Sequence, residues 1–199
     1  MTKPKDIQKQ EDIYTAVGRA LSAWSLVEEH LCLIFTRVTI SDPMAPTGAT
    51  MAAFWAIESF RGKLNAVDAA LRLNFSKTPS IIGEWERLYK RAREKNNLRN
   101  DLAHGIAMIF SGAVDEVYFL PSFFKTRLIE IAAFDPSSST ILDIRPKNRL
   151  TAKQINDRTQ AFNAFRERLD RFQARVYDEV QRRRALMGKL QSERPLAKG

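Results

Sequence analysis

The chain has 199 residues and a formal net charge of +9, a size that suits one compact domain. Hydrophobic residues make up 44% and charged residues 28%, a composition that excludes a disordered chain. The single cysteine, Cys32, excludes an internal disulfide and cysteine-rich metal sites. The apolar runs, such as residues 31–35, are far shorter than a membrane span, and the polar N-terminus does not resemble a signal peptide. We therefore expect a cytoplasmic protein without a membrane partner.

The excess positive charge is concentrated near the C-terminus. Residues 147–199 hold 14 lysines and arginines against 6 carboxylates, whereas residues 105–146 hold 3 against 5. Such clustering favours a polyanionic partner, and nucleic acid before an anionic membrane. The densest run, Arg182, Arg183 and Arg184, is suited either to following an RNA backbone or to solubilising a projecting helix end. Charge alone leaves both interpretations open.

Apolar residues recur every three or four positions in four long segments, which predicts four helices. The first covers about residues 10–40 and the second about 49–74, separated by a loop rich in proline. The third begins at Pro79, after Thr78 as its cap, and stops at Gly105, which we expect to be left-handed. The fourth begins with a capping box at residues 151–154 and extends to about residue 187, before Gly188. Three tryptophans on these segments are expected in the core: Trp24, Trp55 and Trp85.

Residues 106–146 lack helical periodicity. Apolar runs at 106–110 and 117–120 flank a Ser-Gly turn, and those at 128–134 and 141–144 flank a Pro-Ser loop, which predicts two pairs of strands. The predicted fold is therefore mainly α, a four-helix bundle with a small antiparallel β insertion between the third and fourth helices. We expect a single domain over residues 1–190 and a flexible polar tail over 191–199.

Most catalytic motifs are absent from the sequence. It contains no glycine-rich phosphate loop, no Gly-x-Ser-x-Gly elbow and no His-Glu-x-x-His. With two histidines, one cysteine and no acidic cluster, we expect no metal and no cofactor. His30, which follows two glutamates on the first helix, is better explained as a boundary residue than as a catalyst.

The segment from Lys95 to Gly105 carries the candidate chemistry. Steps of seven along the third helix lead from Trp85 through Ala92 to Arg99, so the core-facing side becomes cationic in the last turns. A charge there must be paired, or must line a space that water or a ligand enters. His104 lies five residues further on, roughly 140° around an ideal helix. The two side chains can therefore flank a phosphate-sized group.

This segment resembles the HEPN superfamily. The motif Arg-Asn followed by three residues and His closes a helix, and Arg99, Asn100 and His104 occupy the positions of the family's Arg-x(4–6)-His motif. The segments around Trp24 on the first helix and Phe60 on the second are also similar to those of other helical bundles. In these bundles a later helix ends in Arg-Asn-Asp-Leu-Ala-His-Gly, as the third predicted helix does here. The resemblance implies a metal-independent endoribonuclease, with a toxin or defence effector as the role and an antitoxin or regulatory protein as a further partner.

The residue types suit that chemistry. Histidine titrates near neutral pH and can act as general base or acid, and arginine offers a fixed fork of donors to phosphate. Cleavage needs two such acid–base groups, and the family is understood to supply them by forming a homodimer, so we expect His104 and Arg99 of two copies around one RNA. The products would be a 2′,3′-cyclic phosphate and a 5′-hydroxyl.

Other residues are expected to support the site or to bind RNA. Asn100 or Asp101 would hold the Arg99 fork in place, and Lys95 and Asn96 are candidate phosphate contacts beside the basic run at 182–184. Three alternatives remain. Arg99 and His104 could simply stabilise the helix C-terminus, as cations do. The chain could be a non-catalytic dimeric bundle that binds RNA or a protein partner, or a pure dimerisation scaffold.

Overall fold

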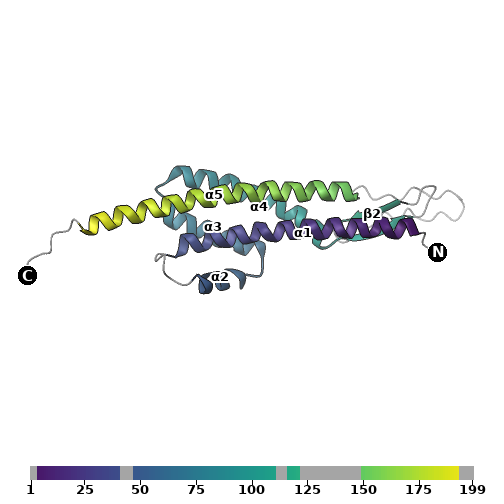
Figure 1. Ribbon diagram of the computed structural model, residues 1–199, viewed down its shortest axis with the longest axis horizontal. Helices are drawn as coiled ribbons and strands as arrows, with labels where there is room; N and C mark the ends of the chain where they lie inside the picture. The colour runs from purple at the N-terminus through teal and green to yellow at the C-terminus, as the bar shows by residue number, and fades with distance from the viewer. Residues whose placement is uncertain (1–3, 41–46, 111–115, 122–148, 193–199) are drawn as a thin grey trace, which may run out of the picture. The chain divides into compact units, whose positions relative to one another are not determined.

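The computed structural model describes residues 4–40, 47–110, 116–121 and 149–192. Over this part of the chain the fold is mainly helical with one small antiparallel sheet, as the sequence predicts (Figure 1). The elements, in chain order, are α1 (Pro4–Thr39), α2 (Gly48–Trp55), α3 (Phe60–Phe75), α4 (Pro79–Ala103), β1 (Ile106–Phe110), β2 (Glu116–Leu120) and α5 (Ala152–Ser192).

The predicted helix over 49–74 is in fact two helices, α2 and α3. Ser59 is extended and its hydroxyl accepts a hydrogen bond from the Gly62 amide at 3.0 Å, so it caps the N-terminus of α3. A Cβ atom at Gly62 would lie only 2.7 Å from the side chain of Ile57. The turn between the two helices therefore depends on a close approach that a glycine permits.

The start of α5 is as predicted, but its end is not. The Thr151 hydroxyl accepts from the Gln154 amide at 3.2 Å, and the Gln154 side-chain oxygen accepts from the Thr151 amide at 2.8 Å, which completes the capping box. The helix then continues through Gly188 to Ser192. A glycine inside a helix lowers its stability by only about 1 kcal/mol relative to alanine, so Gly188 does not by itself end α5.

The first predicted strand pair is confirmed. β1 and β2 are antiparallel, with Ile106 opposite Leu120, and Leu150 extends the ladder by exchanging backbone hydrogen bonds of 2.9 and 2.8 Å with Phe119. The second predicted pair, at 128–134 and 141–144, lies outside the described residues, as does the tail from residue 193 onward.

The chain divides into two compact units. The first comprises Met1–Leu26 and Glu94–Ala164. Within its described residues, the rings of Trp24 and Phe162 pack edge to face at a centroid distance of 5.2 Å. Phe119 of β2 is buried, and Gln10 of α1 donates to the Ala107 carbonyl of β1 at 3.5 Å. Its core therefore combines helix and sheet around the C-terminal end of α4.

The second unit comprises Val27–Arg93 and Phe165–Gly199. Its core includes Trp85 of α4, which stacks on Phe172 of α5 at 5.8 Å and donates its indole N–H to Asp68 at 2.9 Å. A buried indole thus has the polar partner it needs. Trp24 and Trp85 are almost fully buried, as predicted, whereas Trp55 is 45% exposed and the core prediction for it is wrong. The early end of α2 places Trp55 at a helix terminus rather than on a continuous apolar face.

Candidate functional site

Arg99 lies in the last two turns of α4, on the side of the helix that is apolar further upstream. Ala92 before it and Leu102 after it are buried, whereas Arg99 is half-buried. Its Nη1 donates to the side-chain oxygen of Asn100 at 3.2 Å. Its Nε is sealed from solvent and has no hydrogen-bond partner among the described residues. Within that part of the chain no carboxylate forms an ion pair with Arg99.

Asn96 precedes Arg99 by three residues, so the two side chains are neighbours on the helix surface. The Asn96 side-chain oxygen is also buried and, among the described residues, has no partner. Each buried polar atom left in this state costs about 1–3 kcal/mol. A donor and an acceptor one turn apart can be satisfied by a water molecule or by a polar group of a bound molecule.

His104 is exposed just after the end of α4. Its backbone amide donates to the Asn100 carbonyl at 3.2 Å, so the helical hydrogen-bond pattern continues to this residue. The imidazole makes no hydrogen bond or ion pair with any residue that the structure describes. Five residues separate it from Arg99, a rise of roughly 7.5 Å along a helix. An exposed imidazole and a half-buried guanidinium are therefore held at one end of one element.

Gly105 follows His104, and its role differs from the predicted one. Its backbone is not left-handed, which corrects the expectation of a left-handed stop. A Cβ atom at this position would lie 2.3 Å from two ring carbons of Phe119 and 2.5 Å from the Leu120 carbonyl oxygen. The glycine is needed because β2 passes directly against the backbone here, which holds the hairpin beside His104.

Asp101 does not hold Arg99 in place; it pairs instead with Arg158 of α5. The Arg158 Nη1 lies 3.9 Å from an Asp101 carboxylate oxygen and donates to the Leu98 carbonyl at 3.3 Å. Burial lowers the pKa of Arg158, and the nearby Asp101 charge partly opposes that effect. Of the two supporting residues predicted, Asn100 therefore contacts Arg99 and Asp101 does not.

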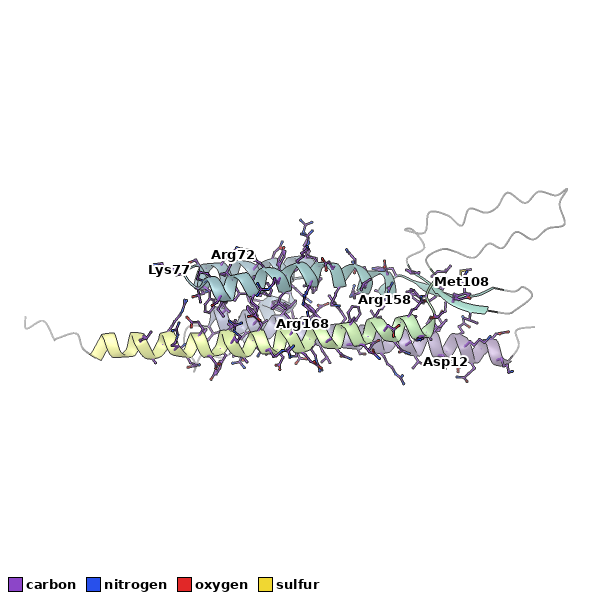
Figure 2. The ribbon with its side chains drawn as sticks, turned by 90° about the horizontal axis from the view of Figure 1, so that it is seen from above. Asp12, Arg72, Lys77, Met108, Arg158 and Arg168 are labelled. Atoms are coloured by element: carbon purple, nitrogen blue, oxygen red, sulfur yellow. The ribbon has the colours of Figure 1, made fainter. Side chains whose placement is uncertain are left out.

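Sequence reasoning missed Arg158, which is labelled on α5 in Figure 2. A signal was present, because Arg158 interrupts the apolar stripe between Ile155 and Phe162, both fully buried. A cation within an apolar stripe requires either a partner or access to solvent or a ligand.

The remaining predicted residues fall in different places. Lys95 and Asn96 are half-buried on α4, in the same unit as Arg99, and Lys95 interacts with another residue. The basic run at 182–184 belongs to the other unit. Both Arg182 and Arg183 pair with Glu179, and their hydrogen bonds lower the pKa of that carboxyl group, the Arg182 bond contributing most.

Arg183 and Arg184 also stabilise helix ends. Arg183 donates to the Asn74 carbonyl at the end of α3 and to the Thr78 hydroxyl before α4. Arg184 donates to the Ile40 carbonyl, just after α1, at 2.7 Å. Carbonyl groups at helix C-termini lack helical partners, so cationic donors satisfy them well. These contacts give two of the three arginines a structural role, and their contact with RNA stays a prediction.

The described ranges contain no group of three or more histidine, cysteine, aspartate or glutamate residues placed to hold a metal ion. Nor does any helix in those ranges combine the length and the apolar character needed to cross a bilayer. No protein-family model matches the chain, and no curated protein or solved structure matches it significantly.

Proposed function

We propose that this protein is a metal-independent endoribonuclease whose site is built from Arg99 and His104, in a helical bundle of the HEPN type. The observation that carries the proposal is the state of these two side chains. His104 is exposed without a partner among the described residues, and Arg99 keeps a buried donor unused while the nearby Asp101 pairs with another arginine. A purely structural pair would be expected to satisfy its donors internally.

The proposed reaction uses the substrate's own 2′-hydroxyl as nucleophile. A histidine removes the 2′ proton as that oxygen attacks the adjacent phosphorus, and the bond from phosphorus to the 5′ oxygen breaks. A second acid protonates the departing 5′ oxygen, leaving a 2′,3′-cyclic phosphate and a 5′-hydroxyl. The Arg99 guanidinium stabilises the extra negative charge on the phosphorane, and Asn100 limits the rotation of its fork.

The two proton transfers require two titrating groups, and each chain supplies one exposed histidine here. We therefore propose that the active species is a homodimer in which the α4 ends of two copies act on one phosphate. His30 is an unsuitable second group, because its Nε2 lies 3.7 Å from a carboxylate oxygen of Asp170, with which it can pair.

The second candidate is a non-catalytic bundle that binds RNA or a protein. It is favoured by the contacts of Arg158 with Asp101 and Leu98, which tie α4 to α5 and give this region a structural purpose. In this case Arg99 and His104 would contribute only charge.

Incubation of the protein with total RNA in EDTA separates the two candidates. We expect wild-type cleavage, a loss of about 10²–10⁴-fold in rate for His104→Ala, and near wild-type activity for His30→Ala, the matched control. Arg99→Lys keeps the charge but loses the fork and should also be impaired. Unchanged cleavage by His104→Ala would refute the proposal, and RNA retention without cleavage by the wild type would favour the binding module.

A further inference from the structure

The second unit contains a surface on which arginines gather without acidic partners. Its position follows from the antiparallel packing of α4 and α5. Arg183 contacts Thr78, Arg175 contacts Glu84, and Phe172 stacks on Trp85. Residue numbers therefore rise along α5 as they fall along α4 at this interface.

The Arg175–Glu84 ion pair shows which faces of the two helices meet. Arg171 and Arg168 lie four and seven residues before Arg175, on the same face of α5. Arg87 and Arg91 lie three and seven residues after Glu84, on the same face of α4. The packing register then brings Arg171 to the level of Arg87, and Arg168 to the level of Arg91. We call these four residues the seam arginines: Arg87, Arg91, Arg168 (labelled in Figure 2) and Arg171.

All four seam arginines are exposed, and none forms an ion pair or hydrogen bond with a described residue. Glu84 is already engaged by Arg175. Glu86 pairs with Arg72 of α3, and Glu167 makes no ion pair with a described arginine. Like charges so placed repel one another, so this surface costs stability unless an anion binds to it.

The dimensions of the surface suit a chain of phosphates. Three to four residues of helix correspond to a rise of about 5 Å, and packed helices lie about 8–10 Å apart. Two rows of guanidinium groups at that spacing can contact successive phosphates of one strand. On these turns no large hydrophobic side chain is exposed, whereas helices that bind membrane surfaces present such side chains to the lipid.

We propose that the seam arginines bind the backbone of single-stranded RNA. The inference rests on RNA as the ligand of the proposed function, but not on cleavage. It also assigns phosphate binding to arginines with unused donors, instead of Arg183 and Arg184, whose donors are directed at backbone carbonyls. The planar guanidinium fork recognises phosphate without reading the base, so binding is independent of sequence.

The test is the salt dependence of binding to a 2′-O-methyl oligonucleotide, which cannot be cleaved by 2′-hydroxyl attack. Fluorescence anisotropy would be measured for the wild type, for Arg168→Gln/Arg171→Gln, and for Arg61→Gln/Lys77→Gln. The last variant removes the same charge from exposed positions of the same unit. Loss of two phosphate contacts should reduce the slope of log K against log salt by about 1.4 in magnitude, whereas the control should keep the wild-type slope.

Equal slopes in the two variants would overturn the proposal, because net charge alone would then explain binding. Preference for anionic vesicles over the oligonucleotide, or no binding at low salt, would overturn it too. A melting temperature at or above that of the wild type is expected for Arg168→Gln/Arg171→Gln, since repulsion is removed; a clear decrease would indicate a structural role. If only Arg168→Gln/Arg171→Gln reduces the slope but the wild type never cleaves RNA, RNA binding by the seam arginines is supported and the nuclease proposal is refuted.

Discussion

Replacement of Gly105 by alanine tests how the end of α4 is held against the hairpin. The new Cβ would lie 2.3 Å from two carbons of the Phe119 ring and 2.5 Å from the Leu120 carbonyl oxygen. Phe119 is only 1% exposed, and the Leu120 oxygen belongs to the strand backbone, so neither can move freely. Overpacking of this kind typically costs about 1–3 kcal/mol, and two contacts at such distances place the loss near the upper value.

Urea denaturation measures the effect. With a slope of about 1–3 kcal/mol per molar urea, a loss of about 3 kcal/mol lowers the unfolding midpoint by about 1–3 M. Gly18→Ala is the matched control, because Gly18 lies within α1 and a Cβ there meets nothing within 4 Å. That variant should be stabilised by about 0.5–1 kcal/mol. A wild-type midpoint for Gly105→Ala, or a similar loss for Gly18→Ala, would refute the reasoning.

Three further predictions concern local interactions. Thr151→Ala should lower the unfolding free energy by about 1 kcal/mol in urea titrations, because it removes the capping box with Gln154; no change would show that the cap is dispensable. Since arginine partners lower the pKa of Glu179, its contribution to stability is present above the ordinary glutamate range and is lost as the pH falls through the lowered pKa. Glu179→Gln should therefore flatten the acid limb of stability against pH, and an unchanged acid limb would contradict this assignment. Burial raises the pKa of Cys32, so a thiol reagent should react slowly with native protein and quickly in denaturant; fast native reaction would show that the site opens.

Helical periodicity predicted most of the architecture because each long helix buries one continuous stripe. On α1, Ile13, Trp24 and Leu31 are buried as expected. The break between α2 and α3 was missed because Ile57 and Phe60 continue the three- and four-residue spacing across it. The spacing of Ser59 and Gly62 was the local signal, since a serine cap needs an amide three residues later and this amide belongs to a glycine.

The candidate site was only partly predictable. Arg99, Asn100 and His104 were recognisable within one helix end, because their relation depends on local geometry. The pairing of Asp101 with Arg158 was not predictable, because Arg158 belongs to a different helix, α5. The Leu98 carbonyl, which Arg158 also contacts, is 60 residues away from it in sequence. The structural roles of Arg183 and Arg184 were missed for the same reason: their acceptors are carbonyl groups, which carry no sequence signature.

The chemical nature of the ends left on cleaved RNA tests the central claim most directly. The wild-type protein would be incubated with a defined single-stranded RNA in EDTA, and the fragments examined by mass spectrometry. Attack by the 2′-hydroxyl, promoted by His104 and Arg99, predicts fragments with a 2′,3′-cyclic phosphate and a 5′-hydroxyl. Intact RNA, or fragments that carry a 3′-hydroxyl and a 5′-phosphate, would contradict it.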